Sequence, residues 1–277
     1  LEAGGSGLDG RRNFLRGYAL LRLGRQTDAL PSFQLALEKL PALRVYTLFY
    51  LAEAAEGTGE AGRERRALEE LLRTDPKGPL APSSYKRVAA LDLSEGAPLR
   101  AAARLGRLLR FFPQEERAPA ILAMRAEALE EGGRRREAAL AWRELWRTHP
   151  ESEEAREALG RAGSLAAGLT PPLPAPGAVD HYRRARLLQK RYYYDKALAA
   201  YGELKRRYPN SPYRRQIALQ EALVLYALRR TSKAGDAIWQ SIQLFSAGSP
   251  ERTKARYYQT RNHLRARDRN AFERDGR

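Results

Sequence analysis

A proline at a fixed place in a repeated spacing constrains this chain more than any other feature. A small or apolar residue is followed by residues four, seven and twelve positions further on, and the last is always Pro. Steps of four and three place side chains on one face of an α-helix, and a Pro five residues later ends that helix. The six frames are Ala29, Phe33, Ala36 and Pro41; Glu64, Leu68, Leu71 and Pro76; Ala101, Leu105, Leu108 and Pro113; Ala138, Trp142, Leu145 and Pro150; Ala197, Tyr201, Leu204 and Pro209; Ile238, Ile242, Phe245 and Pro250. The sequence therefore predicts an all-α stack of helical hairpins.

The turn inside each hairpin has a signal of its own. Seventeen residues before the first four prolines lie Gly24, Gly59, Gly96 and Gly133. Glycine there lets a helix end with a positive φ and lets two helices approach closely. The fifth and sixth frames place Tyr192 and Lys233 at this position, so we expect those two turns to be looser or differently closed.

This pattern resembles the tetratricopeptide repeat, whose second helix carries a small residue, an aromatic residue four positions later and a closing Pro. Gly17 also fits the small position of its first helix, and the resemblance runs from about Arg11 to the end. It implies a tetratricopeptide-like α-solenoid, a superhelix of helical hairpins that serves as a binding surface. Glu64 departs from the pattern, because a carboxylate at a buried small position is costly. We expect that repeat to be distorted or slipped by one residue.

The chain divides by composition into four stretches. Residues 1–10 are predicted to be a flexible N-terminal segment, residues 11–159 a block of about four hairpins, and residues 179–277 a basic block of hairpins. Between them, residues 160–178 contain Pro171, Pro172, Pro174 and Pro176 and form either a stiff linker or a long loop packed on the repeats. One more first helix is readable after Pro250, and a second begins at residues 271–272. We therefore expect the chain to stop inside a repeat of a longer protein.

Positive charge is concentrated in the last hundred residues. Residues 178–277 hold 23 Lys and Arg against 9 Asp and Glu, a net charge of +14, whereas residues 1–177 hold 27 against 24, a net charge of +3. Such a field attracts polyanions, although solvated helix faces are an equally simple explanation. The tyrosines of the turn at residues 192–194 could stack on a sugar or base. The candidate contacts to an anionic ligand or cell wall are Arg183, Arg184, Lys190, Arg191, Tyr193, Arg206, Arg207, Arg214 and Arg215.

The residues that usually carry catalysis or bind metal are missing or scattered. The chain has no Cys, which excludes disulfides and thiolate chemistry. His149, His181 and His263 have no second ligand at a metal-binding spacing. Phosphate loops and hydrolase motifs are absent, and no apolar run approaches the length of a membrane span. The sequence predicts a chain that is not an enzyme, without a catalytic site, cofactor or metal.

The last hundred residues resemble the superhelical, non-catalytic domain of bacterial soluble lytic transglycosylases. The resemblance rests on Leu169-Thr-Pro-Pro-Leu-Pro, His181-Tyr-Arg-Arg-Ala-Arg-Leu-Leu, Tyr194-Asp-Lys-Ala-Leu, Tyr208-Pro-Asn-Ser-Pro and Ala255-Arg-Tyr-Tyr-Gln-Thr-Arg. It implies a periplasmic or cell-envelope scaffold whose partners are its own C-terminal catalytic domain and peptidoglycan. Glu151-Ser152 matches the catalytic dipeptide of that family, but no Gly-Leu-Met-Gln segment follows it, so it is assigned no catalytic role.

Two other functions remain open. The chain could be a general protein–protein adaptor, of the kind found in cell-envelope assembly lipoproteins or in the cytoplasm, and its partner would then be another protein. A nucleic-acid-binding repeat protein is disfavoured, because repeats that read bases need a recurrent polar pair in each unit, and no such pair recurs here.

Overall fold

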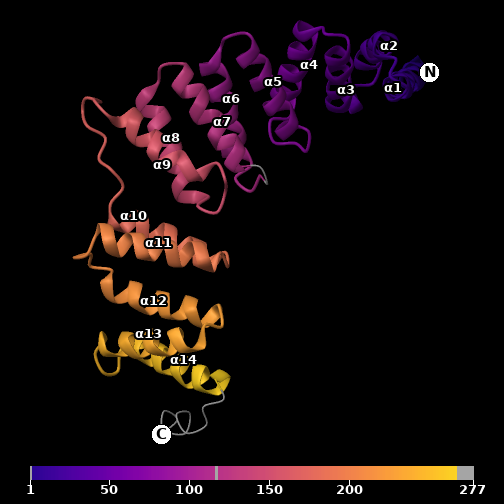
Figure 1. Ribbon diagram of the computed structural model, residues 1–277. Helices are drawn as coiled ribbons and strands as arrows, with labels where there is room; N and C mark the ends of the chain where they lie inside the picture. The colour runs from indigo at the N-terminus through magenta and orange to yellow at the C-terminus, as the bar shows by residue number, and fades with distance from the viewer. Residues whose placement is uncertain (1, 116–117, 267–277) are drawn as a thin grey trace. The chain divides into compact units, whose positions relative to one another are not determined.

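The computed structural model describes residues 2–115 and 118–266, and within these ranges the only regular structure is helical (Figure 1). The predicted all-α, tetratricopeptide-like fold is therefore confirmed. The chain divides into two compact units, Leu1–Trp142 and Arg143–Arg277, and the division falls inside α8. In the first unit each helix from α1 to α7 contacts the next, and in the second unit the same holds from α10 to α14. Each unit is thus a stack of helical hairpins.

Most of the helices have 12–14 residues, whereas α1 has 21 and α14 has 17. The first ones are α1 (Glu2–Arg22), α2 (Gln26–Lys39), α3 (Arg44–Gly57), α4 (Ala61–Thr74), α5 (Ala81–Ser94), α6 (Pro98–Phe111), α7 (Ala118–Glu131) and α8 (Arg135–Thr148), with a short 3₁₀ turn, η1 (Pro41–Leu43), after α2. They are followed by α9 (Ala155–Ala166), α10 (Ala178–Lys190), α11 (Tyr194–Arg207), α12 (Arg214–Ala227), α13 (Thr231–Gln243) and α14 (Pro250–Ala266).

The hairpin turns share one backbone conformation. Gly24, Gly59, Gly96 and Gly133 have φ values of 72°, 74°, 69° and 75°, as the spacing predicts. Tyr192 and Arg229 take the same left-handed conformation, with φ values of 66° and 58°. The amide of Tyr193 donates to the Leu188 carbonyl and the amide of Arg230 to that of Leu225, as Arg25 does to Leu20. The expectation of looser turns is therefore wrong. The turn at Tyr192 and the sixth turn, which lies at Arg229 because the predicted position Lys233 is inside α13, close like the glycine turns, at the cost of a side chain in a strained backbone conformation.

This strain leads to a stability prediction. We expect Arg229→Gly to raise the free energy of unfolding by about 1 kcal/mol. A non-glycine residue in the left-handed region costs about 1–2 kcal/mol, and the larger chain entropy that glycine loses on folding offsets part of the gain from removing that cost. Thermal unfolding followed by circular dichroism measures the change. The matched control is Gly96→Ala, where an added Cβ meets no atom within 4 Å, so that only backbone strain lowers its stability. An unchanged or lower midpoint for Arg229→Gly would contradict this account.

The positive-φ residue also sets the helical register of each hairpin. Residues five, nine and twelve positions after Gly24, namely Ala29, Phe33 and Ala36, are fully buried. The same offsets from Arg229 give Ala234, Ile238 and Ser241, which are fully buried too. The sixth frame predicted from Pro250 is therefore wrong by four residues. α13 ends at Gln243, residues 245–249 form an inserted loop, and Pro250 is the first residue of α14 rather than the end of a helix.

The other prolines do end their helices. Before Pro41, Pro76, Pro113 and Pro209 the preceding residue is the helix cap and has an extended φ between −128° and −141°. Its amide still donates to the carbonyl four residues earlier. A residue before Pro is excluded from the helical region by the proline ring, so the chain leaves the helix at the same point in each hairpin.

Glu64 keeps the regular register, which corrects the expected distortion of the second repeat. Glu64 is 5% exposed, and its carboxylate accepts hydrogen bonds from Arg87 Nε and Nη2 of α5 at 2.9 and 2.7 Å. Arg87 also donates to the Ala52 carbonyl at 3.1 Å. A buried carboxylate is tolerated when it is paired and hydrogen-bonded, and an arginine distant in the sequence provides that pairing.

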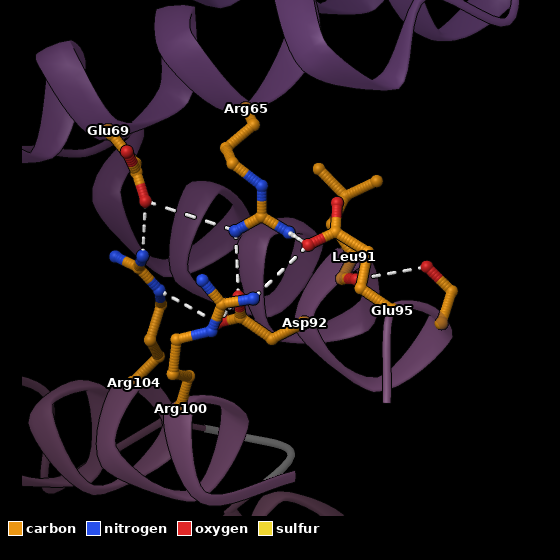
Figure 2. Close-up of polar contacts among 8 residues, drawn as sticks. Arg65, Glu69, Leu91, Asp92, Glu95, Arg100 and Arg104 are labelled. Carbon is orange, nitrogen blue, oxygen red and sulfur yellow. Dashed lines mark hydrogen bonds and ion pairs between the residues drawn. The ribbon is translucent and has the colours of Figure 1, made fainter. Parts of the chain in front are cut away.

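A second buried acid joins three helices of the first unit (Figure 2). Asp92 on α5 is fully buried. Its carboxylate lies 2.7 Å from Arg65 Nη1 of α4 and 3.0 Å from Arg104 Nε of α6, and Arg100 Nε lies 3.5 Å away. Glu69 and Glu95 pair with the outer sides of these arginines. The carboxylate lies near the C-terminal end of α5, where the helix dipole disfavours it, so the arginines are what make its burial possible.

Two of the predicted stretches look different in the structure. The helix α1 begins at Glu2, so residues 2–10 are part of a helix rather than a separate segment. Gly10 explains the packing there, since an added Cβ would lie 2.8 Å from the Leu40 Cβ at the end of α2. In the Pro-rich stretch, Arg143 donates to the carbonyls of residues 173 and 174, and the Tyr208 hydroxyl donates to that of Pro176 at 2.8 Å. These bonds favour the packed-loop alternative within the second unit, but only for residues 167–177, because residues 160–166 of the predicted stretch belong to α9. The predicted second helix at residues 271–272 lies outside the described residues.

Candidate functional site

The candidate site is an open groove of about 780 Å³ in the second unit, formed by one face each of α10, α12 and α14 and by the turn after α10. Its apolar part consists of Leu187, Leu223 and Ala227. Four cationic side chains, four tyrosines and two glutamines surround that floor: Arg183, Arg186, Lys190, Lys254, Tyr192, Tyr194, Tyr226, Tyr258, Gln189 and Gln220. Among the described residues that line the groove, none is Asp or Glu.

The two glutamines present hydrogen-bond donors to the groove. Arg186 Nη1 donates to Gln189 Oε1 at 2.8 Å and also to Gln220 Oε1, and the Tyr201 hydroxyl donates to Gln189 Oε1 at 2.8 Å. A guanidinium group can only donate, which fixes both amide oxygens toward Arg186 and leaves the NH₂ groups as the remaining polar function. Gln220 is only 8% exposed, so its amide is held in place.

The groove cations differ from several other cations of the same unit in their pairing. Arg191 pairs with Glu151, Lys205 with Glu221 and Arg230 with Asp195. Within the described part of the chain, none of the four groove cations forms an ion pair with a carboxylate. Their charge is therefore not neutralised by carboxylates of the described part of the chain, and it acts over a surface with an apolar floor.

The tyrosines of the groove pack against each other rather than forming parallel shelves. Tyr226 and Tyr258 meet edge to face at 5.0 Å, and the Arg265 guanidinium covers Tyr226 at 3.9 Å from the ring centre. Tyr226 is 8% exposed and Tyr192 is 77% exposed. The face of Tyr226 is thus already occupied, and among these rings Tyr192 is the one that projects furthest into solvent.

The predicted contact residues are distributed over three places. Arg183 and Lys190 line the groove. Arg184 and Arg206 line a second depression of about 420 Å³ beside residues 150–156, together with Glu153 and Glu203. Arg184 is half-buried there and donates to the Trp146 carbonyl at 3.3 Å; burial lowers the pKa of its guanidinium. Its contacts within the fold account for its position.

The remaining predicted contacts lie outside both depressions. Arg191 is engaged by Glu151, and Tyr193 lies under the Lys196 ammonium at 5.6 Å. Arg207 lies 5.9 Å from the centre of the Tyr208 ring. Arg214 and Arg215 are exposed at the start of α12. The structure therefore brings together two of the nine predicted residues in the groove and separates the others.

Most of the groove was not predicted from the sequence. Arg186, Lys254 and the two glutamines were missed because their convergence depends on the register of α12 and α14. A signal was nevertheless present: residues 183, 187 and 190 follow each other at steps of four and three, and so lie on one helix face. The same steps connect residues 220, 223 and 227 on α12, and a step of four connects 254 and 258 on α14.

Catalytic and metal-binding groups do not gather at this groove. His181 is 4% exposed and lies between Trp146 and Tyr208, at ring-centre distances of 4.9 and 5.5 Å. Burial lowers the pKa of its imidazole, which favours the neutral form in this packing role. Across residues 2–115 and 118–266 there is no group of three potential metal ligands. None of the helices in these ranges is both long and apolar enough to span a membrane.

Residues 181–211 match the family model of the tetratricopeptide repeat. This stretch contains most of α10, all of α11 and the turn between them. The chain is also similar to a solved tetratricopeptide repeat protein from Parabacteroides merdae, with 15% identity, coverage of 97% of this chain and 91% of that one, and a TM-score of 0.45. For pilF of Pseudomonas aeruginosa the values are 14% identity, 90% and 97% coverage, and a TM-score of 0.38. A comparison with curated proteins gives no match.

Proposed function

We propose that this chain is a non-catalytic protein-binding scaffold, and that the groove of α10, α12 and α14 receives a segment of the partner. The observation that carries the proposal is the composition of the groove: an apolar floor beside fixed polar groups, in a volume of about 780 Å³. Pockets that bind organic groups combine these two features, and stacked helical hairpins bind partners along extended surfaces. The tetratricopeptide match over α10 and α11 supports the same function.

Site-specific photo-cross-linking tests this proposal. Benzoylphenylalanine is placed at Tyr192 or Tyr258, two aromatic residues that line the groove, and in a control at Trp239, which is 57% exposed on α13 and does not line it. In cells of the source organism we expect irradiation to give a discrete protein adduct from both groove positions and none from Trp239. Adducts of equal yield from all three positions, or no protein adduct from the groove, would refute the proposal.

The resemblance to lytic transglycosylases suggests a narrower role, as the periplasmic scaffold of an enzyme that acts in peptidoglycan turnover. The partner would then be the enzyme's own catalytic domain, and peptidoglycan would be an additional ligand. Exposed Arg206, Arg214 and Arg215, which have no carboxylate partner among the described residues, support a contact with the anionic stem peptides of the wall. This role and its location stay predictions, and binding of soluble peptidoglycan fragments to the chain tests the role.

A further inference from the structure

We infer that the segment bound by the groove is acidic, with Asp or Glu side chains interleaved with aliphatic ones. This inference rests on the proposed function and adds the chemistry of the partner. It follows from three properties of the groove: its polar groups, its net charge and its floor.

The fixed polar groups of the groove are donors. The carbonyl oxygens of Gln189 and Gln220 are both turned to Arg186, so their NH₂ groups are what an incoming chain meets. Three further groove cations, Arg183, Lys190 and Lys254, can only donate as well. A ligand that satisfies these groups must be rich in acceptors, and peptide carbonyls and carboxylates are the acceptors that a protein partner offers.

Charge decides between carbonyls alone and carboxylates. Four cations line the groove, and no Asp or Glu is found among its described lining residues. A neutral segment would have to cover these cations without replacing their hydration, which is costly. A carboxylate offers a charge-assisted hydrogen bond in return, which is about twice as strong as a neutral one.

The floor favours a peptide over other polyanions. Leu187, Leu223 and Ala227 offer a surface for aliphatic side chains, which a sugar-phosphate backbone does not have. Base stacking on Tyr226 is blocked, because Tyr258 and Arg265 already cover its ring. Sequence-tolerant binding of single-stranded nucleic acid relies on a series of open aromatic faces, whereas Tyr192 is the one widely exposed tyrosine among the described residues that line the groove. The groove therefore suits an acidic, partly aliphatic peptide better than a nucleic acid.

Fluorescence anisotropy with the full chain tests the inference. The probe is a fluorescein-labelled dodecapeptide of alternating Glu and Leu, and the matched neutral peptide has Gln in place of every Glu. We expect the Glu peptide to bind at least about tenfold more tightly than the Gln peptide at low salt, and this preference to shrink as salt is added. Equal affinity for the two peptides would overturn the inference.

Two variants locate the binding. Lys190→Glu combined with Lys254→Glu should lower the affinity for the Glu peptide by at least about tenfold. The control, Lys233→Glu with Arg256→Glu, changes the net charge equally on exposed residues outside the groove. It should change the affinity by less than about threefold. Gln220→Glu is a finer probe. It keeps an acceptor for Arg186, and so the fold, but removes the NH₂ donor. It should also lower the affinity for the Glu peptide. An unchanged affinity would show that the Gln220 NH₂ group does not bind the ligand.

Competition separates the possible ligand classes. Unlabelled oligo-deoxythymidylate of the same length and soluble peptidoglycan fragments should displace the Glu peptide far less well than unlabelled Glu peptide does. Displacement by the oligonucleotide at equal concentration would overturn the peptide assignment, and displacement by the peptidoglycan fragments would overturn the assignment to a segment of a protein partner. A protein adduct whose cross-linked segment lacks acidic residues would overturn this inference but leave the proposed function intact, whereas failure to obtain a protein adduct would overturn the proposed function itself.

Discussion

Replacing Asp92 by Ala is expected to lower the free energy of unfolding of the first unit by about 3–5 kcal/mol, the usual effect of removing one partner of a buried ion pair. The Asp92 carboxylate is fully buried between α4, α5 and α6, and the arginines 65 and 104 that contact it are 15% and 20% exposed. Without the carboxylate these guanidinium groups lose their shared acceptor in a place that water reaches poorly. Arg100 contributes less, since its side chain is 58% exposed.

Urea unfolding followed by circular dichroism measures this loss, and hydrogen exchange of the amides in α4 to α6 assigns it to the first unit. Asp28→Ala is the matched control, because Asp28 also pairs with an arginine but the two side chains are 51% and 61% exposed. Such a surface pair contributes about 0–1 kcal/mol. Comparable losses for Asp28→Ala and Asp92→Ala would show that burial of the network is not the source of its effect.

Replacing Tyr201 by Ala is expected to destabilise the second unit by about 3–5 kcal/mol, as large-to-small substitutions of aromatic core residues do. Tyr201 is fully buried and packs in one cluster with Leu188, Ile217 and Val224. Its hydroxyl also has a role. Burial raises the pKa of that hydroxyl, which keeps it protonated and able to donate to Gln189.

Tyr201→Phe separates these two contributions. It keeps the ring but loses one hydrogen bond, so we expect a loss of about 1 kcal/mol. The measurement is again urea unfolding, with the second unit monitored through hydrogen exchange of α10 to α12. A loss for Tyr201→Phe as large as that for Tyr201→Ala would mean that the hydrogen bond, and not the ring, dominates at this site.

The sequence predicted the fold well wherever local chemistry decides it. Gly24 and its three counterparts require a positive φ, and prolines such as Pro41 exclude a helix, so both marks are readable without tertiary information. The prediction was wrong in the sixth hairpin, which has neither a glycine in its turn nor a proline directly after its second helix. Arg229 takes the positive φ that glycine has in the other turns, which its residue type does not predict. A loop separates Pro250 from the end of α13, and Pro250 begins α14 instead.

The buried ion pairs and the groove could not be predicted from the sequence, because their residues are far apart along the chain. Glu64 looked like an error in the repeat because its partner, Arg87, lies 23 residues away. The groove cations Arg186 and Lys254 are still further apart, and their convergence depends on how α10, α12 and α14 stack. Basic composition predicted that an anionic ligand was plausible, but it could not distinguish a groove from an exposed helix face.

The proline-rich stretch has a consequence for how the protein can be shortened. Prolines offer carbonyl acceptors without adding amide donors of their own. Arg143 and Tyr208 use the carbonyls of Pro174 and Pro176, together with that of Leu173, to hold residues 173–176 in place. A shorter chain begun at residue 179 would discard these bonds and also Trp146, the ring that packs on His181. These bonds argue that the stretch that looks most like a linker between modules belongs to one module, and we expect a self-contained second module to begin no later than Arg143.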